Sequence, residues 1–135
     1  MAKIYFDAAT SGNPGPSVGA AVIITETERK IETTYLGEMD NHTAEWAAFK
    51  FALELASQHQ VDNALVYTDS KLIEDSMQSE SVKNPLFRPY FEQIQQLESH
   101  FLLLFVKWIP RKSNREANHY AQQGLFQYLK SNKKR

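Results

Sequence analysis

The sequence has 135 residues, of which 42% are apolar and 23% charged, with a formal net charge of −1 and no cysteine. The length suits one globular domain, and the composition excludes disordered and membrane-spanning classes, since no apolar run approaches the roughly 20 residues that cross a bilayer. The lack of cysteine excludes disulfides and thiolate metal sites, and the first residues lack the apolar core of a signal peptide, so we expect a cytoplasmic protein.

The amino-terminal part of the chain predicts three strands joined by short connections. Residues 4–8, 18–25 and 30–36 are rich in apolar and β-branched side chains. A turn-rich stretch at 11–16 separates the first two strands, and residues 26–29 suit the hairpin loop between the second and third. Because these connections are short, we expect an antiparallel meander.

Helices and strands alternate in the rest of the chain. The expected order is helix, strand, helix, helix, strand, helix, over residues 43–58, 64–68, 70–78, 88–99, 101–108 and 114–130. Strands that alternate with helices are expected to run parallel to the first strand. The predicted fold class is therefore α/β, with a mixed five-stranded sheet (three antiparallel strands, then parallel ones) and helices on both faces.

Positive charge is concentrated at the carboxyl end. Residues 107–135 carry eight basic side chains against one acid, a charge of +7 that leaves −8 for residues 1–106. This asymmetry predicts contact with a polyanion. We divide the chain into one domain, residues 1–130, and a basic tail, residues 131–135. The tail taken alone fits a solvated, frayed end equally well.

Two aspartates follow apolar strands at the points where these strands end. Asp7 comes after Ile4-Tyr5-Phe6, and Asp69 comes after Leu65-Val66-Tyr67-Thr68. Ligands of open α/β sheets gather at the carboxyl ends of strands, and two carboxylates there suit a hard divalent cation. The alternative for Asp69 is the N-cap of the helix that follows.

A third acid, Glu45, lies in the first turn of the predicted helix 43–58. The apolar positions that follow at helical spacing are Ala48, Phe49, Ala52, Leu55 and Ala56. The helix dipole explains an acid near the amino end, by about 0.3–1 kcal/mol, but does not explain one on the apolar face. We therefore predict one metal site formed by Asp7, Glu45 and Asp69.

Four short motifs stand in order along the chain. They are Asp7 with the turn Gly12-Asn13-Pro14-Gly15-Pro16, then Asn41-x-x-Ala44-Glu45, then Thr68-Asp69-Ser70, and finally Trp108-Ile109-Pro110-Arg111 with Asn114-x-x-Ala117-Asn118-x-x-Ala121. Together they resemble the type 1 ribonuclease H family from Lys3 to about Leu125. The resemblance implies a ribonuclease H-like fold in a short form, because residues 79–83 lack the basic handle of some members.

The resemblance also implies an activity, the metal-dependent endonucleolytic hydrolysis of the RNA strand of RNA–DNA hybrids. Mg²⁺ or Mn²⁺, two ions with substrate bound, would be held by Asp7, Glu45, Asp69 and Asn118. Arg111 would bind the scissile phosphate. The implied substrate-binding residues are Gly12, Asn13, Asn41, Ser70, Lys112 and Arg115. We expect a monomer with no membrane contact and no obligate protein partner.

Asn118 stands where the family pattern has a fourth acid. The amide removes one negative charge, although its carbonyl can still ligate a metal, so weaker metal binding and slower cleavage are expected. Glu116 lies about 200° away around the helix, and we assign it to a capping box with Ser113. His119 points about 100° away from Asn118, so we expect a surface role for it.

Three alternatives to an active ribonuclease H stay open. The first is a catalytically weak or inactive relative that binds nucleic acid, and Asn118 is the reason for it. The second is a related exonuclease, which is disfavoured because that class needs an acid two residues after Asp7, where Ala9 stands. The third is a small structural or adaptor domain with incidental acids.

Overall fold

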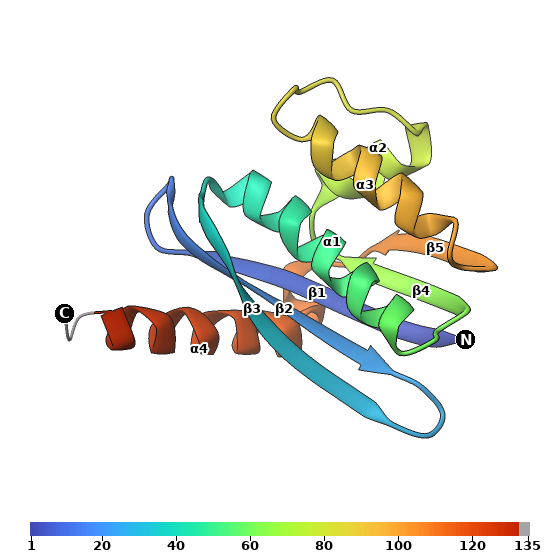
Figure 1. Ribbon diagram of the computed structural model, residues 1–135, viewed down its shortest axis with the longest axis horizontal. Coiled ribbons are helices and arrows are strands. Elements are labelled where there is room, and N and C mark those ends of the chain that lie inside the picture. Colours follow the sequence, from blue (N-terminus) through green and yellow to red (C-terminus); the bar gives the residue numbers. More distant parts are fainter. Residues whose placement is uncertain (133–135) are drawn as a thin grey trace.

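The first three strands form an antiparallel meander in the computed structural model, which describes residues 1–132 (Figure 1). They are β1 (Ala2–Thr10), β2 (Gly15–Ile24) and β3 (Arg29–Met39). β1 pairs with β2 and β2 pairs with β3, both in the antiparallel sense. Gly12 has a φ of +86° in the turn after β1, a backbone conformation that glycine adopts without steric cost. The predicted meander is confirmed.

Two parallel strands extend the sheet on the other side of β1. β4 (Asn63–Thr68) pairs in parallel with β1, and β5 (Leu103–Trp108) pairs in parallel with β4. The order across the sheet is β3-β2-β1-β4-β5, so β1 is the central strand. The predicted mixed five-stranded sheet is therefore confirmed, and β3 and β5 are its edge strands.

The helices of the described residues cover both faces of this sheet (Figure 1). They are α1 (Asn41–Gln58), α2 (Lys71–Ser79), α3 (Arg88–Glu98) and α4 (Arg115–Asn132), with a short 3-10 turn, η1 (Arg111–Ser113), before α4. None of them within residues 1–132 combines the length and apolarity needed to cross a membrane. α4 runs two residues past the predicted domain end at 130, and the predicted tail residues 133–135 lie outside the described residues.

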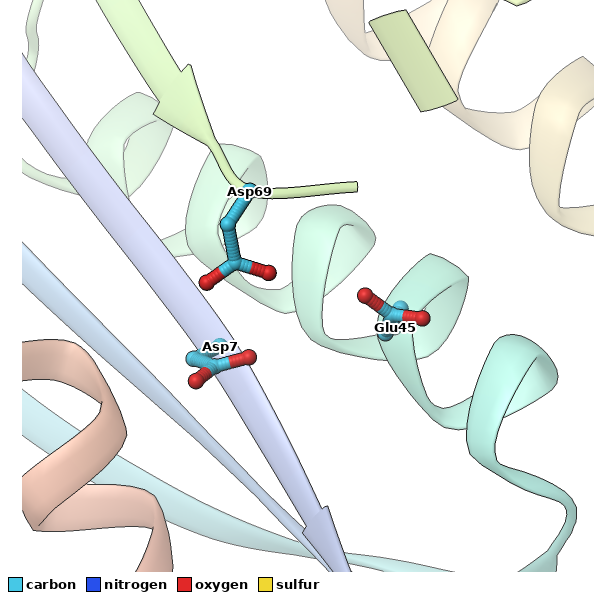
Figure 2. A group of neighbouring side chains, drawn as sticks. All are labelled: Asp7, Glu45 and Asp69. Atoms are coloured by element: carbon cyan, nitrogen blue, oxygen red, sulfur yellow. The ribbon is translucent and has the colours of Figure 1, made fainter. Parts of the chain in front are cut away.

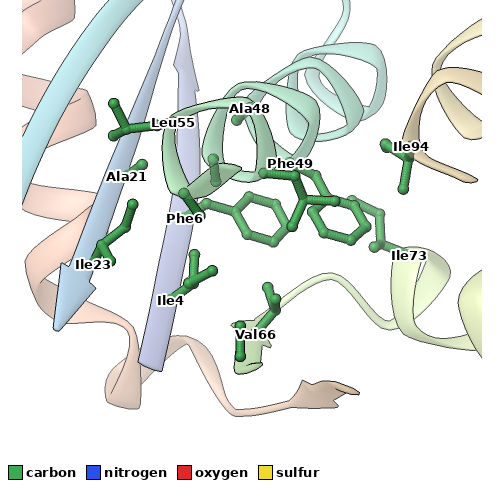
Figure 3. Packing of buried hydrophobic residues seen from close by; sticks show 14 of the residues in the cluster. Ile4, Phe6, Ala21, Ile23, Ala48, Phe49, Leu55, Val66, Ile73 and Ile94 are labelled. Atoms are coloured by element: carbon green, nitrogen blue, oxygen red, sulfur yellow. The ribbon is translucent and has the colours of Figure 1, made fainter. Parts of the chain in front are cut away.

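The alternation of side chains along β1 divides the core into two clusters. Ile4 and Phe6 point to the side of α1, α2 and α3, where Phe6 and Phe49 stack with ring centroids 4.9 Å apart (Figure 3). On the other side, Ala9 packs with Ala121 and Leu125 of α4. β1 is thus covered on both faces. The contacts of Phe6 and Ala9 fix the position of Asp7, which lies between them in the strand.

The predicted capping box of α4 is wrong. Ser113 belongs to the 3-10 turn, and the helix begins only at Arg115, so Glu116 is its second residue and not its third. Ser113 therefore stands one position too early to cap the helix with Glu116. Glu116 instead forms an ion pair with Arg29 of β3.

Truncation of Phe49 tests how much the larger of the two hydrophobic clusters, which lies between the sheet and α1, α2 and α3, contributes to stability. Phe49 is fully buried, and Phe49→Ala is expected to lower the free energy of unfolding by about 3–5 kcal/mol, because the lost transfer free energy and the remaining cavity add. Phe126 of α4 is 65% exposed, so Phe126→Ala should change it by less than about 0.5 kcal/mol. Urea unfolding followed by circular dichroism measures both, and equal effects of the two variants would contradict the packing of Phe49 in the core.

Candidate metal centre

The parallel register of β1 and β4 sets Asp7 opposite Asp69. Ala2 pairs with Ala64 and Tyr5 with Tyr67, and the same offset carried two residues further leads from Asp7 to Asp69. β1 continues to Thr10, whereas β4 ends at Thr68. The strands therefore part at this point, and the carboxyl groups of the two aspartates turn toward one another (Figure 2).

Glu45 reaches the same place from α1. Asp40 caps this helix, since its carboxylate accepts hydrogen bonds from the Thr43 backbone N–H at 2.9 Å and from the Thr43 hydroxyl at 2.6 Å. The Glu45 side chain is 22% exposed. One carboxylate oxygen of each acid lies within 4.8 Å of the other two (Figure 2). The predicted convergence of the three acids is confirmed.

A buried asparagine that our sequence analysis left without a role holds Asp69. The Nδ2 atom of Asn114 donates to Oδ2 of Asp69 at 2.9 Å and to the backbone carbonyl of Phe6 at 2.9 Å. Phe6 is the first residue of β1 beyond the pairing with β4, so Asn114 bridges the two strands where they part. Its Oδ1 atom is buried and has no protein partner within the described residues.

Asn118 lies in the site and presents its nitrogen to Asp7. Its Nδ2 donates to Oδ2 of Asp7 at 2.9 Å, and the backbone N–H of Ala8 donates to Oδ1 at 2.9 Å. Each oxygen of Asp7 thus accepts one hydrogen bond. For Asn118 to ligate a metal, its amide has to turn over so that the oxygen faces the centre.

Burial and mutual repulsion raise the pKa values of two of the acids. The pKa of Asp7 rises to about 6, first because of burial and second because of the negative charge of Asp69. The hydrogen bonds from Asn118 and Ala8 act in the opposite direction and lower this pKa. The pKa of Glu45 rises to about 7 because of burial and then the charges of the two aspartates. Arg111 lowers both pKa values. Without a bound cation, full ionisation of the three acids therefore destabilises the folded protein.

These residues fit a hard divalent cation. Carboxylate oxygens are the ligands that Mg²⁺ and Mn²⁺ prefer, and a cation would offset the repulsion that raises the pKa values of Asp7 and Glu45. The ion pairs found within residues 1–132 join no Lys or Arg to the three acids, and the basic group that lies near Glu45 is the His42 ring, whose Nδ1 atom is 3.5 Å from Oε1 of Glu45. The cluster is thus not a set of ordinary salt bridges.

A cleft of about 370 Å³ opens over the acids. Its other polar walls are Thr10, Asn41, His42, Arg111 and Gln122. Of these, Asn41 and Arg111 were predicted from the sequence, and the other three were not. Gln122 follows Asn118 by four residues, so helical spacing could have found it. His42 adjoins Asn41 at the exposed start of α1, where no local signal separates a site residue from a surface one.

The turn after β1 is tied to the start of α1. Oδ1 of Asn13 accepts a hydrogen bond from the Asn41 backbone N–H at 3.0 Å. Gly12 precedes it in the same turn. The predicted residues Gly12, Asn13 and Asn41 are therefore brought together, with Asn41 at the wall of the cleft.

Three further predicted substrate residues do not line this cleft. Ser70 is buried and caps α2, where its hydroxyl accepts from the Ile73 backbone N–H at 3.2 Å. Lys112 and Arg115 line a separate depression of about 300 Å³ beside Tyr5. A structural cap explains Ser70 completely.

Several known proteins are similar to this chain in sequence. A protein-family model described as reverse transcriptase-like matches residues 5–124. The EbsB protein of Enterococcus faecalis, which carries a provisional hydrolase name, is 36% identical over 135 residues, covering 98% of this chain and 100% of EbsB. Three longer mycobacterial proteins also match, and the chain spans 35% of their length.

Two solved structures show the same architecture. RNase H1 from the halophilic archaeon Halobacterium salinarum is 27% identical with a TM-score of 0.88, covering 93% of this chain and 98% of that one. LC11-RNase H1, solved in complex with an RNA/DNA hybrid, is 31% identical with a TM-score of 0.80, covering 88% and 92%. The order of strands and helices is therefore that of the ribonuclease H fold.

The raised pKa values predict that, without metal, the acid cluster lowers the free energy of unfolding more strongly as pH rises. The folded pKa of Asp7 lies above its ordinary value of 3.8, so folding binds a proton between pH 4 and about 6, and the associated stability is lost as pH rises through this window. Asp7→Asn removes this loss. Relative to Asp7→Asn, the wild type in chelator should lose on the order of 3 kcal/mol between pH 4 and 7.

Urea unfolding at each pH measures this difference. Asp62→Asn serves as the control, because Asp62 is exposed and outside the cluster, and its difference from wild type should stay flat. A flat curve for Asp7→Asn as well would contradict the electrostatic cost assigned to the acid cluster.

Proposed function

The chain belongs to the reverse transcriptase-like family and has the ribonuclease H fold, and on that premise we propose that it hydrolyses the RNA strand of RNA–DNA hybrids as a metal-dependent endonuclease. The observation that carries the proposal is the meeting of Asp7, Glu45 and Asp69 from three separate elements beneath one cleft. The LC11 complex supports it, because that relative binds a hybrid. We propose further that the protein acts as a monomer in the cytoplasm.

Asp7, Glu45 and Asp69 would hold Mg²⁺ or Mn²⁺, with two ions when substrate is bound. Bound ions of this kind activate a water and stabilise the leaving 3′ oxygen of an in-line phosphodiester hydrolysis. The protein's own contribution is to keep the carboxylates in place before binding. Asn114 orients Asp69, while Asn118 and the Ala8 N–H orient Asp7.

The walls of the cleft would bind the hybrid. Arg111 lines the cleft, where its guanidinium would pair with a phosphate of the hybrid. Asn41, with Asn13 behind it, would lie near the 2′-hydroxyls that distinguish RNA from DNA. Lys112 and Arg115 lie in the separate depression, so any contact of theirs with the hybrid is to its backbone away from the cleaved bond.

A second candidate is a catalytically weak or inactive relative that binds nucleic acid. The observation that favours it is the hydrogen bond from Asn118 to Asp7. This neutral donor stabilises the ionised aspartate, but it supplies no charge to a cation. The centre therefore has three carboxylates, and its hold on metal depends on these alone.

Hybrid cleavage separates the two candidates. We expect wild type to cut the RNA strand of a labelled hybrid with Mg²⁺ or Mn²⁺, Asp7→Asn to abolish cutting, and Asn118→Asp to raise its rate about tenfold or more, because a fourth carboxylate strengthens the metal site. Denaturing gels resolve the products. If only Asn118→Asp cuts, the second candidate is correct, and if neither cuts while both stay folded, the nuclease proposal fails.

Metal binding can be measured without turnover. Saturating Mn²⁺ or Mg²⁺ should raise the Tm of wild type, since a ligand at 100 times its Kd stabilises by about 2.7 kcal/mol. Asp7→Asn should lose most of this shift, and the exposed-site control Asp62→Asn should keep it. Scanning calorimetry with and without metal gives the answer, and equal shifts in both variants would favour the adaptor-domain alternative.

A further inference from the structure

α4 covers only part of its face of the sheet. It packs against β1, β2 and β3, to one side of β4 and β5 in Figure 1. On β5, Leu104 and Val106 turn to the opposite face and pack against the larger core cluster. By alternation, Leu103 and Phe105 point to the side of α4, where they stay 49% and 52% exposed.

The uncovered part of this face carries an aromatic strip. The sheet register sets Tyr5 beside Tyr67, and their rings stack with centroids 4.7 Å apart and an interplanar angle of 16°. In the next row, Leu65 pairs with Phe105. Apolar and aromatic side chains from β1, β4 and β5 thus form one continuous surface, which we call the open face.

Basic side chains surround the open face. Lys3 and Lys107 are exposed and stand in the same two rows of the sheet as the aromatic residues. Lys112 and Arg115 line the depression of about 300 Å³ that has Tyr5 in its wall. The acid of that depression, Glu116, is paired with Arg29.

The charges decide which occupant fits the open face. A second copy of the chain across a twofold axis would set these lysines against each other, whereas a polyanion complements them. An aromatic ring can stack on a base only where the base is unpaired, because bases of a duplex already stack on their neighbours. Exposed rings together with surrounding cations are the combination that binds single strands.

We propose that the open face binds single-stranded nucleic acid, with bases stacked on Phe105 and the Tyr5–Tyr67 pair and phosphates held by Lys3, Lys107, Lys112 and Arg115. The surface does not use the acids, so the binding needs no metal ion. It is thus separate from the proposed hybrid cleavage, and either can hold without the other.

Fluorescence anisotropy with a labelled 12-nucleotide single strand in EDTA tests the proposal. We expect Phe105→Ala to weaken binding by about 5- to 150-fold, the range for loss of one stacked base. Lys107→Gln should reduce the slope of log affinity against log salt by about 0.7, the value for one phosphate contact on a single strand.

Matched controls come from the exposed surface of α4. Phe126→Ala and Lys130→Gln remove the same side-chain types outside the open face and should leave affinity within about twofold. Phe105→Tyr keeps a ring and should retain binding, which separates stacking from a folding defect. The proposal is overturned if Phe105→Ala binds like Phe126→Ala, if Phe105→Ala weakens the binding of a duplex as much as that of the single strand, or if light scattering shows a dimer that Phe105→Ala dissociates.

Discussion

β1 and β4 pair in parallel as far as Tyr5 and Tyr67 and then separate, and the metal centre occupies the separation. Parallel register alone sets Asp7 and Asp69 at equivalent positions. A continued ladder would fill the space between them with backbone hydrogen bonds. The early end of β4 leaves that space to side chains, and α1, which crosses the same sheet, brings Glu45 into it. Three like charges can meet there only because the surrounding core fixes all three elements.

Neutral amides stabilise this cluster without neutralising the negative charge that attracts a cation. Asn114 and Asn118 each donate to one aspartate, at 2.9 Å in both cases. A Lys or Arg in either place would lower the pKa values further, but it would also neutralise the charge that attracts a cation. The remaining repulsion still raises the pKa of Glu45 to about 7. The folded protein therefore carries an electrostatic cost that binding of a divalent cation would relieve.

The parts of this arrangement that follow local rules could be predicted from the sequence. Periodicity and turn residues predicted all five strands, and the positions of Asp7, Glu45 and Asp69 at strand and helix ends predicted their convergence. The role of Asn114 could not be predicted, because its partners Phe6 and Asp69 are distant along the chain. The capping box failed because the 3-10 turn shifts the start of α4, which local spacing cannot show.

Side-chain alternation on β1 links the metal centre to the open face. Tyr5 and Asp7 point to the same side of the strand, one in the stacked aromatic pair and the other in the acid cluster, about 7 Å apart along the backbone. α4 begins near this point and covers only the part of the face that β1, β2 and β3 form. A longer or shifted helix would cover Tyr67 and Phe105 as well. Asn114 immediately precedes this helix and Asn118 lies in its first turn, so the placement of α4 orients both aspartates. The same placement leaves the open face uncovered.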